Sequence, residues 1–191
     1  YSYAFYAPTL ILWDLYSDDD KRRDVYIAPY WINNKEAIVA WKYDEKKKEI
    51  VQRSCGKFRR EWETSSMKHK NYTPENYPVL RFSDVLLMQA EAENEANNGP
   101  TDKAYKAINT VRERAGLEAL KNLDYATFQQ EVRDERAREL CFESLRKYDL
   151  VRWGIYVKAI HDDLGKATKD KRWAPGNNFL GAAAYANNTT E

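Results

Sequence analysis

Three glutamates spaced one helical turn apart are the side chains best placed to do chemistry in this 191-residue chain. Glu135, Glu139 and Glu143 recur every four residues, so a helix would place all three on one side. Two carboxylates facing a cleft could serve a glycoside hydrolase, and the Cβ atoms of Glu139 and Glu143 would lie roughly 6 Å apart. Catalytic pairs, however, usually come from separate elements, and several arginines stand nearby in the sequence. We therefore interpret the glutamates as structural and predict no catalytic residue.

These glutamates interrupt an apolar stripe. Phe128, Val132 and Phe142 fall on the same side of the expected helix, at steps of three and four residues. Charges on a core-facing side must be paired, because an unpaired one costs several kcal/mol. The stripe therefore predicts a partly buried ionic lattice. Its expected members are Arg81, Asp84, Glu91, Glu135, Glu139, Glu143, Arg146, Asp149 and Arg152.

The partners of this lattice follow from the spacing. Arg81 and Asp84, at i and i+3, are expected to form a local ion pair. Arg81, Arg112 or Arg114 is expected to meet the buried glutamates.

Other site chemistries are not indicated. A di-iron bundle needs a Glu-x-x-His spacing, and neither His69 nor His161 lies in one, so no metal site or cofactor is expected. The 32% charged residues balance to a net charge of +1, which argues against a nucleic-acid partner, since that needs a basic face. The sequence has no run of 18 apolar residues that could span a membrane.

The aromatic residues of the first third are the better functional candidates. Aromatic residues make up 14% of the chain, and this segment is rich in them without a clear core period. Tyr and Trp rings can stack on the apolar faces of sugars, while amides bond the hydroxyl groups. The alternative is that these rings close the hydrophobic core. The residues we expect to contact a glycan are Tyr3, Tyr6, Tyr30, Trp31 and Asn33.

Residues 1–77 form the first of two expected regions, which together make one domain. Thr9 is expected to cap a short helix beginning at Leu10. Residues 25–27 and 37–41 are β-prone and could pair as a small hairpin. The run from Asp18 to Arg23 is interpreted as a solvated turn.

Residues 78–191 form the second, helical region. A helix from Phe82, apolar almost all round, is expected to be central, to be buried, and to end with an αL cap at Gly99. Thr101 is expected to cap a second helix that ends at Gly116. A third helix should begin near Thr127, run through the charged stripe toward Trp153, and be followed by a short helix over 155–164.

The fold class that follows is mainly α. It combines a helical hairpin over 82–116, of tetratricopeptide length, with a long helix and an irregular, β-poor first third. One such hairpin cannot bury both of its faces, so it needs neighbours.

Three stretches together resemble the SusD/RagB family, and they cover 78–154. Residues 78–92 (PVLRFSDVLLMQAEA) are similar to the family's Arg-Tyr-Ala-Asp-Val-Leu-Leu-Met-Tyr-Ala-Glu-Ala signature. Residues 107–117 (AINTVRERAGL) and 135–154, with Glu-Leu-x-Phe-Glu and Asp-Leu-x-Arg-Trp-Gly, follow in the family's order. A weaker similarity over 8–77 includes the family's Asp-x-Arg turn, at Asp20 and Arg22.

The resemblance implies a non-catalytic glycan- or nutrient-binding lipoprotein exposed on the outer membrane of Bacteroidetes, covering a SusC-like TonB-dependent transporter. The family's lipid-anchor cysteine and closing region are missing, so we expect a fragment of the family's C-terminal half. An interaction scaffold without glycan binding stays open, as does the glycosidase. The sequence does not decide which nutrient binds, where all of its site lies, the oligomeric state, or whether Cys55 and Cys141 are bonded.

Overall fold

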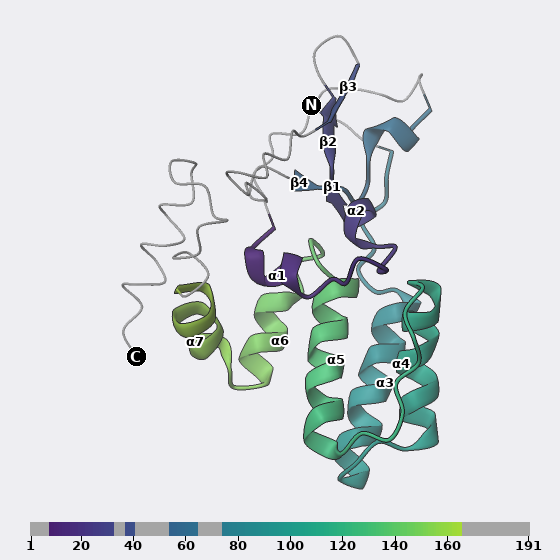
Figure 1. Ribbon diagram of the computed structural model, residues 1–191, viewed down its shortest axis with the longest axis vertical. Coiled ribbons are helices and arrows are strands. Elements are labelled where there is room, and N and C mark those ends of the chain that lie inside the picture. The colour runs from purple at the N-terminus through teal and green to yellow at the C-terminus, as the bar shows by residue number, and fades with distance from the viewer. Residues whose placement is uncertain (1–7, 33–36, 41–53, 65–73, 166–191) are drawn as a thin grey trace.

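The computed structural model of the chain describes residues 8–32, 37–40, 54–64 and 74–165. The structure is mainly helical, as predicted, and three of its helices lie side by side (Figure 1). These are α3 (Phe82–Asn97), α4 (Asp102–Arg114) and α5 (Tyr125–Glu139). Beyond α5 come α6 (Arg146–Arg152), α7 (Tyr156–Lys158) and a π-helical segment, Ala159–Leu164.

The core of the three-helix layer is small and apolar. Phe128 of α5 is fully buried and meets the ring of Tyr105 edge-on, with ring centres 5.2 Å apart. Alanines on α3 and α4 let the helices approach closely. The buried cluster consists of Leu87, Ala90, Ala104, Ala107, Ile108, Val111, Phe128 and Val132.

The ends of α3 and α4 follow local capping chemistry. The Thr101 hydroxyl accepts a hydrogen bond from the Ala104 amide, as predicted. Gly116 follows α4 with φ +82°, a conformation that glycine adopts without a steric penalty. The αL residue after α3 is Asn98, with φ +50°, and not Gly99 as predicted. Asparagine can take this role because its short polar side chain tolerates the left-handed region.

The prediction that α3 is central and buried is correct for one side of the helix only. Its buried side carries Leu87 and Ala90 beside polar Asp84 and Asn94. Its opposite side leaves Phe82 72% exposed. The exposed apolar side chains on and just before α3 are Val79, Leu80, Phe82, Val85 and Met88.

The predicted long third helix is two helices. It starts earlier than expected, because Asp124 and not Thr127 is the N-cap, accepting a hydrogen bond from the Thr127 amide at 2.8 Å. It ends at Glu139, and the chain turns before α6 begins at Arg146. Phe142 and Ser144 have φ of +63° and +61°, which a helix cannot include. Phe142 and Arg146 therefore do not continue the stripe of α5.

The first third forms short elements. Helix α1 (Leu10–Asp14) is capped by Thr9, as predicted, and α2 (Arg23–Tyr26) follows. Strands β1 (Ile27–Ala28) and β4 (Ser54–Cys55) pair antiparallel, as do β2 (Tyr30–Ile32) and β3 (Ile38–Ala40). The expected hairpin therefore exists, but its first strand is residues 30–32 and not 25–27. A five-residue connection suits such a hairpin.

A turn after β4 packs the first third together. Gly56 lies so close to α2 that a Cβ there would be 2.3 Å from the Val25 carbonyl oxygen. The segment continues into a 3₁₀ turn, Arg60–Trp62.

Both cysteines are free thiols, and burial raises the pKa of Cys141 to about 11. Of the helices in the described ranges, none has the length and apolar character to span a bilayer.

Candidate functional site

Arg22 lies at the centre of an ion cluster that joins the first third to α5. Its guanidinium binds both oxygens of Asp20, at 2.9 and 2.7 Å, and its Nη1 donates to Glu135 at 2.6 Å and to Glu139 at 2.9 Å. Arg22 and Asp20 are almost fully buried. The interpretation of 18–23 as a solvated turn is therefore wrong for these two residues. The weak similarity to an Asp-x-Arg turn was the sequence signal that pointed to them.

Glu139 is completely buried, and its carboxylate accepts hydrogen bonds from three arginines. Arg81 Nη1 donates to it at 2.6 Å, Arg114 also donates, and Arg22 reaches its other oxygen. Burial by itself raises the pKa of Glu139, but the bonds from Arg114 and Arg81 outweigh that effect and lower the pKa to about 2. Glu139 is thus a permanently ionised structural anion at neutral pH.

Glu135 and Glu143 extend this cluster in two directions. Glu135 is fully buried and accepts from Arg138 at 2.7 Å and from Arg112 at 3.4 Å. Glu143, in the turn after α5, accepts from Arg81 at 2.8 Å and from Lys57. The turn between α5 and α6 is what brings Glu143 back to these cations.

A second ion cluster ties α3 to α5 and α6. Arg136 donates to Asp84 and to Asp149, both at 2.8 Å. Arg152 joins Asp149 to Glu91, which also accepts from the Trp153 indole at 2.7 Å. Burial raises the pKa of Glu91, but the bonds from Arg152 and Trp153 lower it further than burial raises it.

Two expected partnerships differ from the structure. Arg81 and Asp84 do not pair with each other, because Arg81 is the extended residue before α3 and turns toward Glu139 and Glu143. Arg146 is half-buried and contacts no carboxylate of the described chain. It donates instead to the Arg133 carbonyl at 2.9 Å and lies over the Trp153 ring.

Neither cluster has the features of a catalytic centre. A glycosidase acid needs access to substrate and a raised pKa, whereas Glu139 is buried with a lowered one. Its neighbour Glu143 is buried among cations. Within the described ranges, no group of three His, Cys, Asp or Glu side chains could hold a metal ion.

The aromatic platform, which we define as Tyr30, Arg59, Glu61 and Trp62, is an accessible site. Arg59 lies 4.9 Å from the Tyr30 ring centre and 5.6 Å from that of Trp62. It also donates to the Tyr30 hydroxyl at 2.5 Å, and that hydroxyl donates to Glu61. Trp62 is 59% exposed. The arrangement offers an open indole face next to a partly exposed carboxylate.

Arg59 is itself locked in place by backbone carbonyls. Its Nε donates to Gly56 at 2.8 Å, and its Nη2 donates to Asp24 at 2.9 Å and Val25 at 2.8 Å. Because its guanidinium donates to three backbone carbonyls, Arg59 is fixed in position and supports the rings of Tyr30 and Trp62.

The structure describes only some of the residues that we expect to contact a glycan. Tyr30 belongs to the platform, and Trp31 follows it in β2, where its backbone pairs with Val39. Tyr3, Tyr6 and Asn33 lie outside the described residues. Sequence reasoning missed Trp62, although a Trp flanked by charged residues was the available signal.

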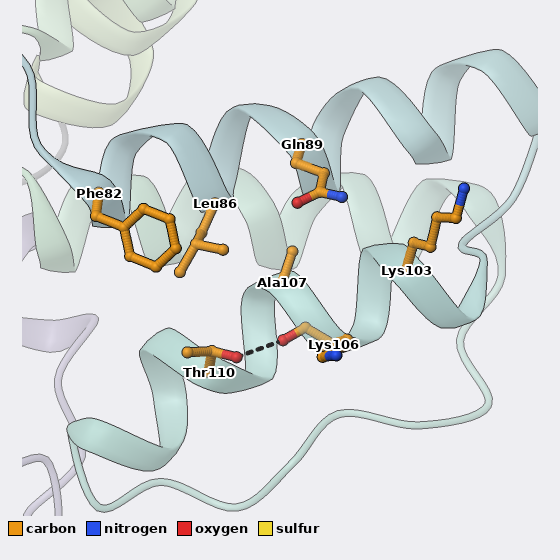
Figure 2. A pocket seen from close by; sticks show the side chains of 7 residues that line it. All are labelled: Phe82, Leu86, Gln89, Lys103, Lys106, Ala107 and Thr110. Atoms are coloured by element: carbon orange, nitrogen blue, oxygen red, sulfur yellow. Dashed lines mark hydrogen bonds between the residues drawn. The ribbon is translucent and has the colours of Figure 1, made fainter.

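A second accessible surface lies on the outer side of α3 and α4. Figure 2 shows Phe82, Leu86 and Gln89 of α3 facing residues of α4 across a pocket of about 420 Å³. Two lysines stand on its α4 side. The α4 residues that line it are Lys103, Lys106, Ala107 and Thr110. This is the face of the helical hairpin that α5 does not cover.

Comparison with known proteins gives consistent matches. The sequence profile of the SusD family matches residues 12–190. SusD-like protein P25 from Formosa agariphila is 43% identical over an alignment of 109 residues that covers 55% of this chain and 19% of that protein. The chain thus spans about a fifth of the length of that relative.

Solved structures agree on the fold. The crystal structure of a SusD homologue from Bacteroides thetaiotaomicron matches with a TM-score of 0.70 and 29% identity, covering 87% of this chain and 36% of that one. Surface glycan-binding protein A from Bacteroides uniformis matches with a TM-score of 0.53 and 26% identity, covering 90% of this chain and 33% of that one.

Proposed function

The chain belongs to the SusD family, and from this membership and its aromatic platform we propose that it captures glycans at the outer-membrane surface without cleaving them. The captured oligosaccharide would pass to a SusC-like TonB-dependent transporter. The name of the Bacteroides uniformis relative, a surface glycan-binding protein, supports the ligand class. Because this chain covers only part of its relatives, the transporter, the membrane location and the ligand are all parts of the proposal.

The observation that carries the proposal is the exposed indole of Trp62 above a rigid support. Sugar rings present C–H faces that stack on such a ring. The Glu61 carboxylate, which accepts from the Tyr30 hydroxyl, has capacity to accept from sugar hydroxyls as well. The donors of Arg59 are directed at protein acceptors, so its part is to hold the platform. A neutral oligosaccharide fits this set of groups.

Binding to a single platform would be modest. A stacked ring contributes about 1 kcal/mol, so several must act together, and micromolar to millimolar affinity follows, on the order of −4 to −8 kcal/mol. Tyr30 and Trp31 remain proposed contacts, as do Tyr3, Tyr6 and Asn33.

The test is a glycan-array screen of the purified protein, followed by calorimetry with the strongest hit. Trp62→Ala is expected to weaken binding roughly fivefold or more, since it removes a stacking face. Tyr148→Ala is the matched control, because Tyr148 is also an exposed aromatic but stands on α6, away from the platform. If Trp62→Ala and wild type bound the glycan with equal affinity, the platform would not be part of the binding site.

The alternative function, an interaction scaffold, is favoured by one observation. The exposed apolar side of α3, from Phe82 to Met88, together with the pocket beside α4, could receive a helix of another protein segment. Phe82→Asp would then abolish association with that partner segment, because it places a charge on the apolar side of α3. Loss of association without any measurable glycan binding in the wild type would favour the scaffold.

A further inference from the structure

Two arginines differ from the others in their partners. Among the guanidinium groups in the described part of the chain, nine contact a carboxylate. Arg133 and Arg146 do not, although both are half-buried. Two half-buried arginines without a carboxylate partner are therefore unusual among the described residues of this protein.

Both unpaired guanidiniums lie against one ring. Their centres are 5.3 Å and 5.5 Å from the ring centre of Trp153, and Arg152 is a third neighbour at 4.7 Å. Arg152 is already bound to Glu91 and Asp149. Arg133 and Arg146 therefore both stack on the ring of Trp153, and neither forms an ion pair with a carboxylate of the described residues.

Their hydrogen-bond donors are largely unused. Arg146 donates one hydrogen bond, from its Nη1 to the backbone carbonyl of Arg133. The Nε of Arg133 is buried and has no acceptor, although buried N–H groups are normally satisfied. Within the described residues, the buried Nε of Arg133 thus has no acceptor, and Arg146 makes a single side-chain hydrogen bond.

Among the described residues, the nearby carboxylates form no ion pair with Arg133 or Arg146. Burial lowers the pKa of Arg146, and the through-space attraction of Asp149 and Asp134 does not offset it. Asp149 is committed to Arg136 and Arg152, and Asp134 accepts from Gln130 at 2.9 Å.

We infer that Arg133 and Arg146, which both stack on the ring of Trp153, form a binding site for a small oxyanion, a sulfate or a carboxylate group. Guanidinium forks match the geometry of such groups and bind them with charge-assisted hydrogen bonds. The site is separate from the aromatic platform and does not depend on glycan capture there.

The test follows the indole N–H signal of Trp153 by NMR in the purified protein, assigned as the peak missing from Trp153→Phe. Sodium sulfate and sodium glucuronate are titrated separately against sodium chloride at equal ionic strength. Saturable movement of this peak with sulfate or glucuronate, but not chloride, is the expected result. Response to sulfate alone assigns a tetrahedral oxyanion, and response to glucuronate alone assigns a carboxylate.

Variants separate the site from general salt effects. Arg133→Gln is expected to raise the apparent Kd at least fivefold, and Arg146→Gln gives a second, independent removal of a donor. Arg23→Gln is the matched control and should bind as wild type, because Arg23 also stacks on a Trp, at 5.0 Å from the Trp13 ring, but is paired with Asp18 and Asp24. Absence of a response beyond chloride, or an unchanged Kd in Arg133→Gln, overturns the inference.

Discussion

Replacing Glu139 by Ala should be among the most destabilising single changes in this chain. The variant removes a buried carboxylate and leaves Arg81, Arg114 and Arg22 without that partner. Breaking a buried ion pair typically costs 3–5 kcal/mol, so we expect a loss of about that size. The lowered pKa points the same way: a fall from 4.5 to about 2 favours the ionised over the protonated form of Glu139 in the folded protein by roughly 3 kcal/mol. The side chain is fully buried, so solvent screening does not reduce this value.

Urea unfolding at pH 7, followed by circular dichroism, measures the effect. Glu113→Ala is the control, because Glu113 is an exposed residue of α4 and its loss should change the unfolding free energy by no more than about 0.5 kcal/mol. A loss below about 1 kcal/mol in Glu139→Ala, at an unchanged urea dependence, would refute a stabilising role for the cluster.

Three other predictions concern Glu139 and the two cysteines. Since the folded pKa of Glu139 is lowered, its contribution to stability is complete above pH 4.5 and is lost as the pH falls toward 2; wild type should lose more stability than Glu139→Gln between pH 5 and pH 3 in urea titrations. The purified protein should release no reducing ends from oligosaccharides, and a release that vanishes in Glu139→Gln would mean that the carboxylate is catalytic. In the native protein Cys141 should react with iodoacetamide more slowly than Cys55, because it is buried and its pKa is raised to about 11; mass spectrometry after partial labelling would reveal the opposite order.

The helices that could be predicted are those whose signals are local. Thr101 caps α4, Gly116 ends it, and Ala107, Ile108 and Val111 face the core at the expected spacing. Each of these preferences acts within one or two turns, so the sequence states it directly.

The break after α5 could not be read in the same way. Leu140, Cys141 and Phe142 continue an apolar pattern that a helix could accommodate. The chain turns instead, and the carbonyl of Glu139 receives Lys57 at 2.8 Å and Arg81 at 2.6 Å. Both partners are distant in sequence, so the contact that accompanies this helix end has no local signal.

The candidate sites show the same division. The helical spacing of Glu135 and Glu139 indicates that they are buried and paired, but not that Arg22 lies between them. The platform brings Tyr30 to Arg59 across 29 residues, and no periodic pattern predicts such a meeting. Tertiary contacts of this kind need the fold.

The central contact of Arg22 has a consequence for the order in which the protein is made. The carboxylates that bind Arg22 belong to Glu135 and Glu139, which follow it in the sequence by 113 and 117 residues. Asp20 and Arg22 therefore cannot complete these contacts until α5 has formed. Before these contacts form, the exposed residues are Asp20 and Arg22, which are charged and remain hydrated. Because they present no apolar surface, they do not promote aggregation with other unfolded chains.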